Sequence, residues 1–216
     1  MTAFDLVIRN GMVVTATDRM DCDIGVSGGK IVALGKMLGG GAEEIDAAGR
    51  LVLPGGIDSH VHIEQQSSMG IETADDFYSG SVAAAFGGTT TMIPFAVQER
   101  GRALRASIND YHALARPKSV IDYAFHLIIL DPNEQVLGQE LPALIKDGYT
   151  SFKVYMTYDR LRLNDYQLLS VLALAREHGA MAMVHAENHE IIRWLTEKLL
   201  TSGNTAPLFH AVSHPR

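Results

Sequence analysis

Apolar residues along the chain follow two rhythms, and the change falls near Leu51. In residues 4–50, short apolar runs are cut by glycines, and Asn10-Gly11 and Gly28-Gly29 are typical of hairpin turns. This pattern predicts a small antiparallel unit of short strands. We assign residues 1–50 as the N-terminal part of a small β-sandwich domain.

After Leu51, strand-like apolar runs alternate with helical stretches, which is typical of βα units around a parallel sheet. Thr73 is the predicted N-cap of the first helix, and Asn164 is a predicted N-cap because Gln167 follows three residues later. The five predicted strands are residues 51–58, 88–95, 120–130, 150–158 and 180–188. The predicted helices are residues 74–86, residues 102–115, a short helix ended by Gly148, a helix between Asn164 and Gly179, and residues 190–200.

These five units suggest part of a barrel. A closed (β/α)8 barrel contains eight units and typically ~250 residues, whereas about 165 residues follow the N-terminal unit here. We therefore expect residues 51–216 to form the first, truncated part of an α/β, TIM-like (β/α)8 barrel. An open doubly wound sheet of five strands is the alternative, but the many polar groups at the strand ends favour the barrel.

Charge and cysteine content exclude several classes of protein. The formal net charge is −7, and no basic stripe is present, so we expect no nucleic-acid partner. Cys22 is the only cysteine, which excludes an internal disulfide and fits a reducing, cytoplasmic location. We expect no targeting signal and no membrane span, because no segment approaches ~18 to 20 apolar residues.

The ends of the predicted strands carry residues suited to a metal site. Side chains alternate along a strand, so His60 and His62 point to one face, where two imidazoles can bind one cation. Lys153 and His185 follow at the ends of the fourth and fifth strands. Alone, the histidine pair is equally well explained as two half-buried strand residues, and Lys153 alone as a surface lysine. Together, at matching strand ends, they predict a metal centre.

A lysine can join such a centre only after it loses its proton, because its usual pKa of ~10.4 keeps it charged. Desolvation beside cations removes that proton. The free amine of Lys153 can then react with CO₂ to give a carbamate, an oxygen donor able to bridge two metals. Two metals roughly 3.5 to 4 Å apart generate a strong nucleophile from water at neutral pH.

Three segments, GGIDSHVH, SFKVYMTY and VHAEN, together resemble the cyclic amidohydrolases, specifically the dihydropyrimidinase and D-hydantoinase family. This resemblance implies a metal-dependent barrel with two divalent ions, Zn²⁺ or Mn²⁺. It implies that His60 and His62 bind the more buried ion, that carbamylated Lys153 bridges, and that His185 binds the second ion. It also implies that the hydroxyl of Tyr158 polarises the scissile carbonyl.

The implied reaction is hydrolysis of the ring amide in a small cyclic ureide or imide, either a dihydropyrimidine or a 5-substituted hydantoin, to an N-carbamoyl amino acid. The resemblance also implies a homotetramer. The family's sixth-strand His and eighth-strand Asp cannot be assigned before Arg216. Segments similar to the substrate-gating loops of hydantoinases give four weaker candidates for specificity, namely Met69, Phe95, Tyr155 and Leu161.

Several alternatives stay open. The chain could be a non-catalytic dihydropyrimidinase-like scaffold, although such relatives lose the metal ligands. It could be an inactive fragment, and we expect the 216-residue chain alone to be poorly active. Allantoinase-like and dihydroorotase-like activities are further options; Glu64 stands where dihydroorotases usually carry Arg, which disfavours the latter. Among other polar residues, we expect His126 in the barrel interior, His189 on the surface, and Asp58 as a possible orienting partner of a ligand.

Overall fold

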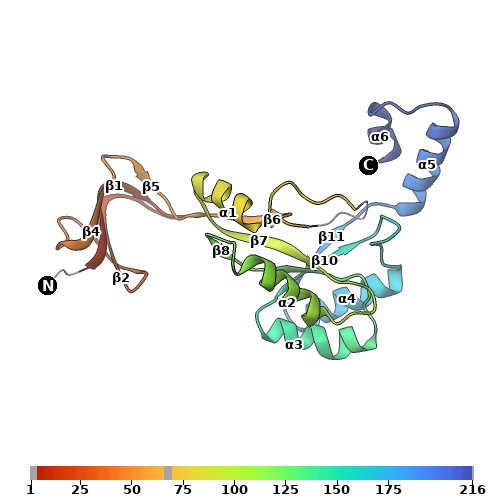
Figure 1. Cartoon of the computed structure of the whole chain (residues 1–216), viewed down its shortest axis with the longest axis horizontal. Coiled ribbons are helices and arrows are strands. Elements are labelled where there is room, and N and C mark those ends of the chain that lie inside the picture. The colour runs from red at the N-terminus through yellow and green to blue at the C-terminus, as the bar shows by residue number, and fades with distance from the viewer. Residues whose placement is uncertain (1–3, 66–69, 216) are drawn as a thin grey trace. The chain divides into compact units, whose positions relative to one another are not determined.

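The computed structural model describes residues 4–65 and 70–215. The chain divides into two compact units, Met1–Gly56 and Ile57–Arg216, whose elements are labelled in Figure 1. The assignment of residues 1–50 and 51–216 to two domains stays a prediction. No helix in the described part of the chain is long and apolar enough to cross a membrane.

The N-terminal unit is a mixed sheet in the order β3-β2-β1-β4, with β5 also paired to β1. β2 is antiparallel to β1 and to β3, as predicted, whereas β4 and β5 run parallel to β1. The strands are β1 (Phe4–Val14), β2 (Arg19–Ser27), β3 (Lys30–Gly35), β4 (Gly41–Asp46) and β5 (Leu51–Val52).

Only one of the two predicted hairpin turns is present. Gly28 and Gly29 connect β2 to β3 with φ values of 60° and 72°, which confirms that turn. The turn predicted at Asn10-Gly11 is wrong, because these residues lie inside β1, where the pairing with β2 shifts register. Asn10 has a φ of 56° there. Some bulges and the tight hairpin turns both place a residue at positive φ, so they use the same residue types.

The first strand of the parallel sheet begins later than the sequence predicted. Leu51–Val52 pairs with Met12 and Val13 of β1 and so belongs to the N-terminal sheet. The parallel strand that follows is β6 (Gly56–Val61). Pro54 separates the two strands, since proline has no N–H to donate to a ladder.

The second unit contains a curled parallel sheet that forms part of a barrel, in the order β11-β10-β9-β7-β6, with the short β8 paired to β7. The five predicted βα units are confirmed, although the third predicted strand is split into β8 and β9. The strands are β7 (Thr89–Val97), β8 (Asp122–Tyr123), β9 (His126–Ile128), β10 (Ser151–Tyr155) and β11 (Met181–His185).

The helices follow the strands in turn. They are α1 (Phe77–Phe86), α2 (Leu104–Ala115), the π-helical turn η1 (Val136–Glu140), α3 (Leu141–Lys146), α4 (Asp165–Glu177), α5 (His189–Thr201) and α6 (Leu208–Ser213). In Figure 1, α2, α3 and α4 gather on one side of the parallel sheet. Helix α5 has no buried residue and extends away from that sheet (Figure 1).

The N-cap predictions had different outcomes. Asn164 accepts from the N–H of Gln167, and the Gln167 side chain accepts from Asn164 N–H, as predicted for α4. For α1 the predicted cap, Thr73, is wrong. Asp76 caps that helix instead, in a reciprocal pair with Ser79. Both caps satisfy backbone donors that the first helical turn leaves free.

The two faces of the parallel sheet pack differently. On the helix face, defined here as the side covered by helices, Leu127, Phe152 and Val154 are buried in the main apolar cluster. On the opposite side, which we call the open face, Phe95 and Ile128 belong to a separate small cluster. Because side chains alternate along a strand, Lys153, which lies between Phe152 and Val154, faces the open side.

Candidate metal centre and active site

The open face carries the two histidines at the end of β6. The ring centroids of His60 and His62 lie 5.7 Å apart, so both side chains point to one face, as predicted. Phe95 of β7 contacts both, with centroids 4.7 Å from His60 and 4.9 Å from His62. Contact with the buried Phe95 ring restricts rotation of the two imidazoles, although both histidines are exposed to solvent.

The surroundings of His60 favour its neutral imidazole. Burial lowers the pKa of His60, and the charges of Lys153, His62 and His126 lower it further, while Asp58 opposes them. Asp58 also accepts a hydrogen bond from the backbone N–H of His60 at 3.1 Å. His62 Nδ1 lies 2.5 Å from Gln65 Oε1, so Nδ1 donates in this bond and Nε2 is the ring nitrogen that remains for a ligand. Neutral imidazole is the form that binds metals.

Lys153 lies on the same open face, in the middle of β10. Desolvation lowers the pKa of its ammonium group. Nζ lies 5.4 Å from the ring centroid of Tyr155, two residues on, which places both side chains on one face. In residues 4–65 and 70–215 no carboxylate forms an ion pair with Lys153. A desolvated lysine without a counter-charge gives up its proton more readily than a surface lysine does.

The ends of β10 and β11 bring His185 and Tyr158 together. The Tyr158 hydroxyl lies 3.5 Å from His185 Nε2, and the ring of Tyr155 stacks on His185 with centroids 5.8 Å apart. His185 Nε2 also contacts Glu187 Oε2 at 2.5 Å. The pairing of Tyr155 with His185 across the two parallel strands sets this arrangement.

The donor chemistry of the open face fits divalent cations. Neutral imidazole nitrogens suit Zn²⁺, oxygen donors suit Mn²⁺, and a desolvated lysine amine can be converted to an oxygen donor. In the described part of the chain, however, no three His, Cys, Asp or Glu side chains form one group that could hold an ion. The candidates therefore lie in two groups, His60 with His62 at β6 and His185 at β11. The charge of Lys153 acts on the first group.

Comparison with known proteins supports the interpretation of these strand ends. The model of the amidohydrolase family matches residues 51–209, which is most of the chain. The chain belongs to the amidohydrolase family. The family resemblance seen in the three sequence segments is thereby confirmed.

Relatives of this amidohydrolase chain carry more specific names. A D-hydantoinase from Geobacillus stearothermophilus is 47% identical over 97% of this chain and 45% of its own length. Solved structures include a D-hydantoinase from Bacillus sp. AR9, with a TM-score of 0.92 and 46% identity, and a dihydropyrimidinase from Brevibacillus agri NCHU1002, with 0.91 and 44%. Each of these two matches covers 97% of this chain and 46% of the solved chain. The chain spans about half the length of the curated relatives it matches.

The four candidates for substrate gating lie in different places in the amidohydrolase unit. Phe95 is buried under the histidine pair, and Tyr155 stacks on His185. Leu161 packs with Phe95 in the open-face cluster. Met69 lies outside the described residues. Phe95 and Tyr155 contact candidate ligands, and Leu161 packs in the cluster that contains Phe95. The role of these residues in specificity stays a prediction.

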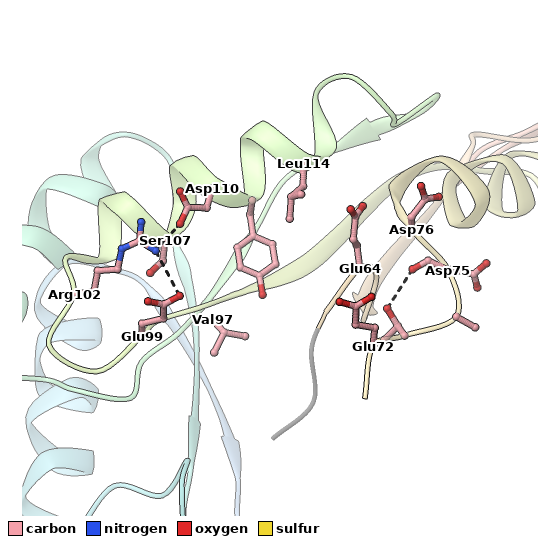
Figure 2. A pocket seen from close by; sticks show the side chains of 13 residues that line it. Glu64, Glu72, Asp75, Asp76, Val97, Glu99, Arg102, Ser107, Asp110 and Leu114 are labelled. Atoms are coloured by element: carbon pink, nitrogen blue, oxygen red, sulfur yellow. Dashed lines mark hydrogen bonds and ion pairs between the residues drawn. The ribbon is translucent and has the colours of Figure 1, made fainter. Parts of the chain in front are cut away.

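Glu64, in the loop after β6, contacts the start of α1 and the segment after α2. Its carboxylate accepts from the N–H of Phe77 at 3.1 Å and forms an ion pair with Lys118 at 2.5 Å. Glu64 therefore binds at the N-terminus of α1 and joins this loop to the segment after α2. Figure 2 shows it at the edge of a mainly acidic cavity of about 670 Å³, lined also by Glu99 and Tyr111.

His126 occupies the position expected from the sequence. It is 4% exposed, with Nε2 donating to the carbonyl of Ser59 at 2.9 Å and Nδ1 2.5 Å from Ser151 Oγ. It therefore connects β9 to β6 and β10. Both ring nitrogens of His126 have hydrogen-bond partners in the protein. His126 is therefore a structural residue beside the histidine pair and not a candidate ligand.

The expectation of a surface position for His189 is wrong. Its side chain is 10% exposed and contacts Thr157 and Asp159. Glu187 was also missed as a partner of His185. Both residues follow His185 closely in the sequence, but burial of His189 depends on the loop after β10. No local pattern in the sequence indicates that contact.

Proposed function

We propose that the protein hydrolyses the ring amide of dihydropyrimidines or 5-substituted hydantoins to N-carbamoyl amino acids. The observation that carries this proposal is the desolvated Lys153 on the same sheet face as His60, His62 and His185. The names of the relatives, D-hydantoinase and dihydropyrimidinase, support the same class of reaction.

The proposed ligands of two divalent ions, Zn²⁺ or Mn²⁺, are His60, His62, His185 and carbamylated Lys153. The Lys153 ammonium group first releases one proton to solvent to give the neutral amine. In the carbamylation step, Nζ of this amine forms a bond to the carbon of CO₂ and releases a second proton, so that an anionic oxygen donor replaces a cation. When bound, such ions polarise a carbonyl and lower the pKa of water to near neutrality.

The protein side chains would then orient and polarise the substrate. The Tyr158 hydroxyl would donate to the carbonyl oxygen of the scissile amide, where negative charge develops. Its position 3.5 Å from His185 Nε2 supports this role, because the donor lies beside a candidate ligand. Phe95 would close the base of the site below the histidine pair and keep water from its inner side.

The remaining expectations are proposals of the same kind. We propose a cytoplasmic homotetramer that acts on small cyclic ureides. The structure gives no support to a dihydroorotase-like activity, because Glu64 binds Lys118 and the start of α1. A carboxylate in that place would not attract a substrate carboxylate.

The direct test measures ring-opening activity and metal content in the full-length product of the gene. Purified protein supplied with Zn²⁺ or Mn²⁺ should open dihydrouracil and hydantoin rings. It should also show a carbamate signal in ¹³C NMR after incubation with ¹³C-bicarbonate. Absence of both bound divalent metal and ring opening would contradict the proposal. Ring opening without the carbamate signal would contradict only the role of Lys153.

A further inference from the structure

The first residue of α5, His189, contacts both chain neighbours of Tyr158. Its Nδ1 lies 3.4 Å from Thr157 Oγ1, and its Nε2 lies 3.2 Å from Asp159 Oδ1. We propose that His189 is a positioning residue that holds Tyr158 in place for the reaction. This inference rests on the proposed function, in which the Tyr158 hydroxyl polarises the substrate carbonyl.

Burial shows that this contact is part of the packed structure. The His189 side chain is 10% exposed, and Thr157 is 3% exposed. The Asp159 carboxylate is on the outer side of the ring, with 85% of its side chain exposed. The imidazole therefore lies between a buried hydroxyl and a solvated carboxylate. Nδ1 has a hydrogen-bond partner, whereas the enclosed Nε2 forms no hydrogen bond within the described residues and meets Asp159 only at ion-pair distance. Packing around the largely enclosed side chain and the bond to Thr157 restrict the rotation of the ring.

Tyr158 itself needs support from outside its own segment. Its φ is 71°, in the left-handed region that residues with side chains seldom adopt. Its carbonyl accepts from the N–H groups of Leu161 and Arg162, both at 2.9 Å. Such a conformation persists only where neighbouring contacts fix it. The two contacts of His189 fix the residues immediately before and after Tyr158.

The position of His189 in the chain gives the contact a further consequence. His185 ends β11, and His189 begins α5 four residues later. Residues 185–189 therefore carry both His185, which the Tyr158 hydroxyl approaches, and His189, which contacts the neighbours of Tyr158. This short segment thus fixes the distance between the Tyr158 hydroxyl and His185. A donor held in advance lowers the barrier of the chemical step and leaves substrate binding unchanged.

The first test removes the ring while recording a property that does not depend on catalysis. In His189→Ala, we expect faster hydrogen exchange at the amides of Leu161 and Arg162, whose bonds to the Tyr158 carbonyl would open more often. His189→Gln can keep an amide nitrogen near Asp159 and should restore most of the protection. Lys198→Ala, at the far end of α5, is the matched control and should exchange as the wild type does.

The second test is a double-mutant cycle on ring opening. We expect His189→Ala to lower kcat about 10-fold to 10²-fold with KM changed less than about twofold, as for a misplaced catalytic donor. In the Tyr158→Phe background the same substitution should have almost no effect, because the group that it positions is gone. If His189→Ala does not fold, Asp159→Asn, which removes the charge that faces His189 Nε2, takes its place in the cycle with Tyr158→Phe.

The outcomes separate the two proposals. Additive effects of His189→Ala and Tyr158→Phe, or unchanged exchange at Leu161 and Arg162, would overturn the positioning role while ring opening by the wild type still supports the proposed function. A Tyr158→Phe protein as active as the wild type would overturn the proposed role of Tyr158, and the inference about His189 would fall with it.

Discussion

Adjacent residues of β10 lie on opposite faces of the parallel sheet, in different surroundings. Phe152 and Val154 are fully buried on the helix face, in a cluster built from several helices and strands. Lys153 and Tyr155 lie on the open face, beside candidate metal ligands and a much smaller apolar cluster. The helix face thus supplies folding free energy, and the open face holds polar groups in a partly desolvated place. Strand alternation lets one segment serve both purposes without a conflict between them.

The largest expected effect is on the open face. Lys153→Ala should lower kcat/KM for ring opening by about 10⁴-fold or more, as for loss of a residue that acts as part of a catalytic unit. Lys153→Arg should lose as much, because a guanidinium keeps its proton and cannot form a carbamate. The free energy of unfolding should change by less than ~1 kcal/mol in Lys153→Ala, since a desolvated charge is removed. Urea titration and steady-state kinetics measure the two quantities.

The neighbouring residue should show the reverse pattern. Phe152→Ala removes a fully buried ring and should lower the free energy of unfolding by ~3 to 5 kcal/mol. Where the variant stays folded, its kcat/KM should stay within about tenfold of the wild-type value. Loss of activity without loss of stability in Phe152→Ala would break the distinction between the two faces.

A smaller effect is expected at the hydroxyl of Tyr158. Tyr158→Phe keeps the ring and removes one donor, so kcat should fall about 10²-fold to 10³-fold while the midpoint of urea unfolding stays the same. Tyr166→Phe is a suitable control, because Tyr166 is a strongly exposed tyrosine on α4. Equal kinetics for both variants would remove Tyr158 from the proposed reaction.

The smallest expected effect is the contribution of His112, on the helix face, to the pH dependence of the free energy of unfolding. Burial lowers the pKa of His112, with a further contribution from Arg116, and its Nε2 lies 2.7 Å from the Tyr149 hydroxyl. The folded state therefore favours neutral imidazole. Its contribution to stability is complete above the unfolded-state pKa of ~6.5 and is lost as the pH falls through and below that value.

Unfolding measured at pH 7.5 and pH 5.5 checks this sign. Comparison with His112→Gln isolates the histidine from the carboxylates, which titrate over the lower part of the same range. The wild type should lose more stability than the variant on acidification. An equal loss in both proteins would show that His112 does not contribute to the pH dependence.

The sequence predicted features that depend on local periodicity. The five βα units, the capping pair of Asn164 and Gln167, and the shared face of His60 and His62 follow from spacings of two to four residues. Residues 51–52 were misassigned because their partner, β1, lies about forty residues earlier. His189 was misjudged for a similar reason. Its burial comes from the loop after β10, and a single sequence carries no direct signal of such a contact.

Metal content per chain is the most direct test of the distinction between the faces. Wild type, Phe152→Leu and Lys153→Ala should be loaded with Zn²⁺ under the same conditions, freed of excess metal, and compared by elemental mass spectrometry. We predict that the wild type and Phe152→Leu retain two ions per chain, whereas folded Lys153→Ala loses at least one of them. Equal metal retention in all three proteins would contradict the assignment of the metal centre to the open face around Lys153.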